Sequence, residues 1–117
     1  MCSDKKQIIL EASQMAGEGD YEEAQKLLFM LQEYHPNCSL VATLLANSYW
    51  NLGNLDSAIK YYERAVNIAP LMEKASLGLF NCLWEQGRKE QAMDEMKRFL
   101  TISDSETYRE ILKEILE

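Results

Sequence analysis

The sequence predicts an all-α protein, an α-solenoid of three helix-turn-helix repeats closed by a C-terminal capping helix. One observation is a period of 34 residues in glycines, alanines and prolines: Gly19, Gly53 and Gly87; Ala24, Ala58 and Ala92; Pro36 and Pro70. Another is that apolar residues recur at three- and four-residue steps, which gives one apolar stripe per helix. The chain also lacks the alternation of Val, Ile and Thr that is typical of strands. A period of this length indicates an array of one supersecondary unit.

The 117 residues suit a single domain, with repeats expected at about 5–38, 39–72 and 73–104 and a capping helix at about 105–117. Each repeat is expected to hold two antiparallel helices. The first helices are predicted at 5–17, 39–52 and 73–86, and the second helices at 21–34, 55–68 and 89–102. One pair cannot bury both of its apolar faces, so the units are expected to stack.

Residues at the helix ends support these boundaries. The repeated glycines fall between the paired helices, where a positive φ costs glycine nothing. Asp20, followed three residues later by Glu23, predicts a capping box, and Asn54 is the equivalent N-cap of the middle unit. Proline ends the second helices because it cannot donate a backbone hydrogen bond. The repeated alanines are expected where the two helices of a pair approach most closely.

The pattern resembles the tetratricopeptide repeat. In the middle unit, residues 39–72, nearly all characteristic positions of that family are filled: Leu45, Ala46, Tyr49, Gly53, Ala58, Tyr62, Ala65 and Pro70. The third unit departs from the pattern with Phe80 and Phe99 at positions that usually hold small residues, and with Asp104 in place of proline. The resemblance covers about residues 5–104 and implies a right-handed solenoid whose first helices line a concave face.

The last segment has an apolar stripe of its own. Ser103 with Glu106 is a helix start signal, and the stripe consists of Tyr108, Ile111, Leu112, Ile115 and Leu116. A helix that shields the last repeat is the expected role. The alternatives are that the stripe docks a second copy of the chain, or fills the groove until a ligand displaces it.

Composition limits the function classes. The net charge of −7 disfavours binding to nucleic acid, because an acidic surface repels phosphates. No segment resembles a signal peptide or a membrane span, and three cysteines without metal or redox spacing suit a reduced compartment, so the cytoplasm is expected. The one histidine, His35, lies in a turn, and no phosphate loop, metal spacing or nucleophile motif is present. We therefore expect no enzyme, no cofactor and no metal.

The resemblance places the candidate binding residues on the predicted first helices of the second and third units. They are Thr43, Asn47, Trp50, Lys74, Leu77, Asn81 and Trp84. An Asn and a Trp three residues apart recur in both units, and residues at that spacing are neighbours on one helix face. A carboxamide can donate and accept hydrogen bonds, which suits a peptide backbone, and tryptophan is typical of interface anchors. The indoles could equally pack between helices.

Two further observations concern this face. Gly78 is a glycine inside a predicted helix, which costs about 1 kcal/mol relative to alanine and implies either close helix contact or room for a ligand. In addition, tetratricopeptide domains that grip a chaperone's C-terminal carboxylate use several cations, and here only Lys74 is present at the corresponding positions. The groove is expected to suit a segment with apolar side chains.

Three functions remain open. The first is a protein-protein interaction module that binds a peptide segment of a partner in its concave groove. The second is a dedicated chaperone of one aggregation-prone client, similar to the three-repeat chaperones of type III secretion. The third is a structural protein that assembles with copies of itself through the ends of the array, as a homo-oligomer.

Overall fold

The structure is a computed structural model that describes residues 2–117, with side chains from Lys5 onward. Seven helices follow one another: α1 (Cys2–Gly17), α2 (Tyr21–Tyr34), α3 (Ser39–Asn51), α4 (Leu55–Ile68), α5 (Glu73–Glu85), α6 (Lys89–Ile102) and α7 (Glu106–Leu116). Within residues 2–117 there is no strand. In the same range no helix is both long enough and apolar enough to cross a membrane.

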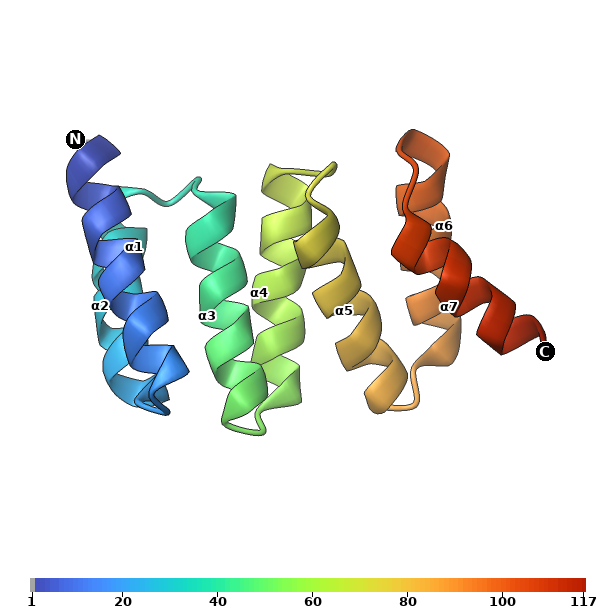
Figure 1. Ribbon diagram of the computed structural model, residues 1–117, viewed down its shortest axis with the longest axis horizontal. Helices are drawn as coiled ribbons and strands as arrows, with labels where there is room; N and C mark the ends of the chain where they lie inside the picture. Colours follow the sequence, from blue (N-terminus) through green and yellow to red (C-terminus); the bar gives the residue numbers. More distant parts are fainter. Residues whose placement is uncertain (1) are drawn as a thin grey trace.

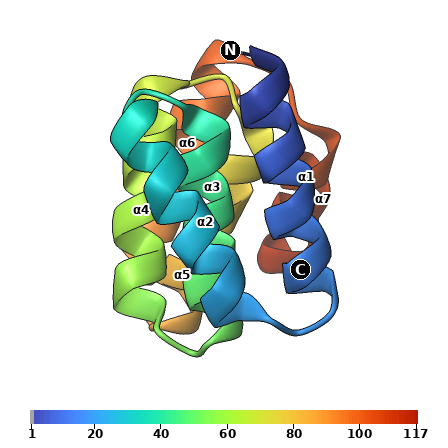
Figure 2. The ribbon, with the colours of Figure 1, turned by 90° about the vertical axis from the view of Figure 1, so that its left-hand side faces the viewer.

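The helices form an elongated array of 44 × 27 × 20 Å, with the chain advancing steadily along its long axis (Figure 1). Each of α1 to α5 packs against the next helix in the sequence, and α3 also contacts α1 and α5. Seen along the array, α1 and α7 lie to one side, while α2 and α4 lie toward the other (Figure 2). This arrangement confirms the predicted all-α repeat solenoid.

The turns inside the helix pairs have the predicted glycine geometry. Gly53 has a φ of 82°, and the two equivalent glycines are also positive. Asn54 then caps α4, because its side chain accepts a hydrogen bond from the Ser57 amide at 3.1 Å. The capping box at Asp20 is wrong, since its side chain makes no cap bond and Glu23 pairs instead with Lys26 at 3.0 Å.

The start of α7 also differs from the prediction. Ser103 is the C-cap of α6, and the N-cap of α7 is Ser105, whose hydroxyl accepts from the Tyr108 amide at 3.1 Å. Ser105 is buried, so this bond satisfies a polar group that water cannot reach.

The buried side chains form two clusters. The N-terminal core joins α1, α2 and α3 through aliphatic residues: Ile9, Ala12, Ala24, Leu28, Leu31, Val41 and Leu45. The C-terminal core runs from α3 to α7 and contains large aromatic and sulfur-bearing side chains, among them Tyr62, Phe80, Cys82, Met96, Phe99 and Tyr108. The repeated alanines are at most 1% exposed, which lets the paired helices approach closely.

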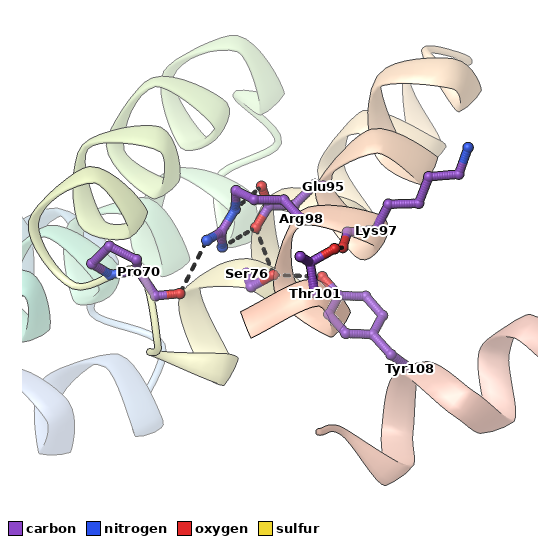
Figure 3. A network of polar contacts seen from close by, with 7 residues as sticks. All are labelled: Pro70, Ser76, Glu95, Lys97, Arg98, Thr101 and Tyr108. Carbon is purple, nitrogen blue, oxygen red and sulfur yellow. Dashed lines mark hydrogen bonds and ion pairs between the residues drawn. The ribbon is translucent and has the colours of Figure 1, made fainter. Parts of the chain in front are cut away.

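A polar cluster attaches α7 to the third unit (Figure 3). Ser76 on α5 donates to a Glu95 carboxylate oxygen at 2.6 Å and lies 2.7 Å from the Tyr108 hydroxyl, which therefore donates to Ser76. Arg98 pairs with both oxygens of Glu95 at 2.6 and 2.8 Å. Burial raises the pKa of Tyr108, so its phenol stays neutral and able to donate. We call Ser76, Glu95, Arg98 and Tyr108 the α7 anchor.

Candidate functional site

The central first helix, α3, has no Asp, Glu, Lys or Arg along its whole length. It lies between α1 and α5 and contacts both. Asn47 and Asn51 are exposed on it, and Trp50 is half-buried. The solvent-facing side of α3 therefore offers two carboxamides and an indole, and no ionised side chain.

Two hollows adjoin along this surface. Hollow A has a volume of about 280 Å³ and lies among α1, α2 and α3. Its lining is mostly small or aliphatic: Ala12, Ser13, Ala16, Gly17, Tyr21, Ala24, Leu28, Leu44, Asn47, Ser48 and Asn51. Hollow B, about 390 Å³, is lined by residues of α3, α4 and α5: Asn47, Trp50, Asn51, Tyr62, Gly78 and Asn81. Because Asn47 and Asn51 border both, the hollows are adjacent, and we call hollows A and B together the groove.

Tyr62 reaches the groove from the core. It is 4% exposed, yet its hydroxyl donates to the Asn47 side-chain oxygen at the border of the two hollows. Burial raises the pKa of the Tyr62 phenol, which keeps the hydroxyl protonated as a donor. This bond holds the Asn47 side chain by its oxygen, which has a second lone pair, and the Asn47 NH2 group is a donor at the border of the two hollows.

Gly78 provides the space for this tyrosine. A Cβ atom at position 78 would lie 2.5 Å from Cζ of the Tyr62 ring and 2.9 Å from Cδ1. The ring therefore occupies the volume that a side chain on α5 would fill. Of the two explanations that the sequence left open for Gly78, close contact with a neighbouring helix is present, and Gly78 also lines hollow B.

Three of the predicted site residues, Asn47, Trp50 and Asn81, line hollow B together. Asn81 is exposed, whereas Trp50 also packs against the C-terminal core with part of its indole. Thus α3 and α5 bring the repeated Asn positions onto one surface. The C-terminal helix does not fill this groove, since neither hollow has a lining residue from α7.

The other four predicted residues lie elsewhere. Thr43 is buried, and its hydroxyl donates to the Ser39 carbonyl of its own helix at 2.8 Å. Lys74 is exposed and Leu77 packs against the C-terminal core, and neither lines hollow A or B. Trp84 stacks on Phe80 with ring centroids 5.6 Å apart and lines a different hollow of about 510 Å³ with residues of α6 and α7.

Sequence reasoning missed the residues at the base of the groove. Leu28 in hollow A and Tyr62 in hollow B come from the second helices, α2 and α4, which the prediction assigned to packing alone. For Tyr62 the sequence did contain a signal, the glycine inside a helix at position 78. A side chain from a neighbouring helix is needed to fill the space beside such a glycine.

Within residues 5–117, no Asp, Glu, Lys, Arg, His or Cys lines hollow A or hollow B. From the described side chains no cluster of three His, Cys, Asp or Glu residues has a geometry that could hold a metal ion. The buried Cys82 is held as a thiol, since burial, aided by the Glu85 carboxylate, raises its pKa to about 12. The groove offers hydrogen bonds and apolar contact, which are means of binding.

Solved structures with the same fold have low sequence identity to this chain. The type III secretion translocator chaperone SycD of Yersinia enterocolitica is 18% identical over 98% of this chain and 80% of its own, with a TM-score of 0.83. The Sgt2 TPR domain of Aspergillus fumigatus is 16% identical over 94% and 75%, with a TM-score of 0.82. The first TPR of Spaghetti (RPAP3), bound to an HSP90 peptide, is 18% identical over 92% and 86%, with a TM-score of 0.81. No curated protein matches the sequence significantly.

A family model described as tetratricopeptide repeat matches residues 16–73 and 43–107, which together span most of the chain. The helix pairs, the glycine turns and the buried alanines described above are the structural counterparts of that match. The chain belongs to the tetratricopeptide repeat family.

Proposed function

We propose that this protein is an interaction module that binds an extended peptide segment of another protein in the groove formed by hollows A and B. The observation that carries the proposal is that hollow B brings together four residues of α3 and α5: Asn47, Trp50, Asn51 and Asn81. Carboxamides can satisfy both the N–H and C=O groups of a peptide backbone, which otherwise lose water on binding. The indole adds apolar area beside them.

Two solved structures of the same fold support this class of ligand. Spaghetti is described as bound to the HSP90 peptide SRMEEVD, and SycD is described in complex with a peptide of the translocator YopD. The SycD complex is 18% identical over 97% of this chain and 87% of its own, with a TM-score of 0.82. Domains of this fold can therefore bind peptides.

The test is the affinity of peptides selected from a random heptapeptide library displayed on phage. Asn81→Ala is expected to weaken the selected peptides about tenfold, the loss of one or two hydrogen bonds. Because Asn81 is exposed, the thermal unfolding curve should not change. The matched control is Asn37→Ala, an exposed asparagine in the turn before α3 that lines neither hollow. Equal affinity of Asn81→Ala and wild type for the selected peptides would exclude this groove.

A second candidate is a dedicated chaperone, favoured by the match to SycD over nearly the whole chain. The two candidates differ in how the partner is held. A dedicated chaperone copurifies with one client in a fixed ratio, whereas an interaction module exchanges peptides freely. Analytical gel filtration after coexpression with a neighbouring gene product, followed by competition with a selected peptide, distinguishes them.

A further inference from the structure

The two hollows are the same site in successive repeats. Each of the six residues that line hollow B, moved back by 34 positions, falls on a residue that lines hollow A. The hollow A counterparts, in order, are Ser13, Ala16, Gly17, Leu28, Leu44 and Asn47. The groove therefore contains two copies of one subsite. Where the two copies have different lining residues, they should accept different groups of a ligand.

The two copies have opposite chemistry. Where hollow A has Ala16, Leu28 and Leu44, hollow B has Trp50, Tyr62 and Gly78. The base of hollow A is therefore aliphatic, while the base of hollow B carries the hydroxyl that orients Asn47. We propose that hollow A takes an aliphatic side chain and hollow B an uncharged hydrogen-bond acceptor, about three residues apart on one extended peptide. This assignment rests on the proposed function.

Size and polarity support the aliphatic assignment. A cavity of about 150 Å³ lined by Leu, Ile and Phe accepts benzene, so the 280 Å³ of hollow A is ample for a leucine or methionine side chain. Burying such a side chain is favourable by about 1.5–3 kcal/mol. A charged side chain would lose hydration there without compensation, because no Asp, Glu, Lys or Arg lines the hollow to pair with it.

Hydrogen-bond polarity supports the acceptor assignment. The Tyr62 hydroxyl already supplies a donor to the Asn47 oxygen, so a ligand acceptor complements the Asn47 NH2 group. A carboxylate would be an acceptor as well, but hollow B has no lining cation to compensate its lost hydration. The carboxamide of glutamine or asparagine is the neutral acceptor of suitable reach, and Asn81 can bond to its NH2 group.

The spacing follows from the packing of the repeats. Helices in contact lie about 8–10 Å apart, and α3 contacts both α1 and α5, so equivalent points of the two hollows are about 10 Å apart. An extended peptide advances about 3.3 Å per residue. The aliphatic and carboxamide residues should therefore be about three positions apart.

The experiment uses the same random heptapeptide library, displayed on phage and selected on the full chain. Peptides enriched on the wild type are expected to pair Leu, Ile or Met with Gln or Asn at a separation of three. Ala16→Trp should abolish the aliphatic preference and weaken Leu-containing peptides about tenfold while the carboxamide preference stays. The backbone of this position accepts tryptophan, since Trp50 is its repeat equivalent. Lys60→Trp, on the exposed face of α4, is the control for an added indole.

Tyr62→Phe tests the other subsite by removing one oxygen and nothing else. It frees Asn47 to rotate, so the Gln preference over an isosteric apolar residue should fall several-fold while the aliphatic preference stays. Enriched peptides that depend on Asn81 but lack the paired pattern, or that contain an acidic residue at the second position, would overturn the subsite assignment and leave the proposed function standing. Peptides that do not depend on Asn81, or no enrichment at all, would overturn both.

Discussion

In the N-terminal core, the buried residues of α1, α2 and α3 are Ala, Val, Leu and Ile, whereas the C-terminal core, from α3 to α7, adds aromatic rings to its aliphatic residues. The same repeat position shows the contrast: Leu28 on α2 corresponds to Tyr62 on α4. The polar contacts differ as well, because the α7 anchor buries Glu95 at 8% exposure within the C-terminal half. The same arrangement of helix pairs is thus packed by aliphatic side chains in one core and by aliphatic and aromatic side chains in the other.

The comparison shows that two tasks, holding neighbouring units together and fixing the position of one helix, need different interactions. Aliphatic packing has no direction, so it favours the contact between units without fixing it finely. Hydrogen bonds are directional, and a buried one that is broken leaves an unsatisfied group. Such directional bonds hold α7 to the third unit, through the α7 anchor.

The largest effect is expected at Tyr108, the fully buried side chain that joins α7 to α5 and α6. Tyr108→Ala should lower the free energy of unfolding by about 3–5 kcal/mol, since it leaves a cavity between Phe80 and Phe99 and removes a hydrogen bond. Urea unfolding followed by circular dichroism measures this loss.

Two variants define what the Tyr108 result means. Tyr108→Phe keeps the ring and should cost only about 1 kcal/mol, because Ser76 still donates to Glu95. Leu116→Ala, on the exposed side of α7, should cost little. If Tyr108→Ala were no worse than Leu116→Ala, α7 would not be part of the cooperative unit.

The next effect concerns the packing of the large Tyr62 side chain against Gly78. The equivalent pair in the N-terminal half is Leu28 and Leu44. Gly78→Ala should destabilise the protein by about 1–3 kcal/mol through overlap with the Tyr62 ring, despite the better helix propensity of alanine. In a Tyr62→Leu background, which copies the Leu28 side of the comparison, the same change should become neutral or stabilising. A cost that is equal in both backgrounds would show that the ring is not the obstacle.

Sequence reasoning was sufficient for the fold because the information is local and repeated. Each turn glycine and each contact alanine can be recognised at its own position and recurs every 34 residues. The helices lie close to the expected ranges. The helix start at Asp20 was right, with Asp20 the N-cap of α2, but its capping box and the start signal at Ser103 were wrong for a related reason. Capping depends on which bond each nearby polar side chain makes: Ser105 takes the cap bond of α7, and Glu23 pairs with Lys26.

The groove was only partly predictable. Asn47, Trp50 and Asn81 follow from helical spacing on the first helices, and they share hollow B. Whether an indole faces the groove or a neighbouring ring depends on contacts between units, and Trp84 stacks on Phe80 with Lys89 above its ring. The base of each hollow comes from a second helix, so no single-helix pattern contains it.

The smallest effect compares the starts of two second helices, α2 and α4. Asn54 accepts a bond from the Ser57 amide, so Asn54→Ala should cost about 1 kcal/mol by exposing an unpaired helix N–H group. Asp20 makes no such bond, and Asp20→Ala should cost distinctly less, leaving only the attraction of its charge to the helix N-terminus. High salt provides the control, because it screens that charge term and leaves the Asn54 bond intact. Equal losses for the two variants in urea unfolding, with and without salt, would mean that Asp20 caps α2 in solution and that the two halves begin their helices in the same way.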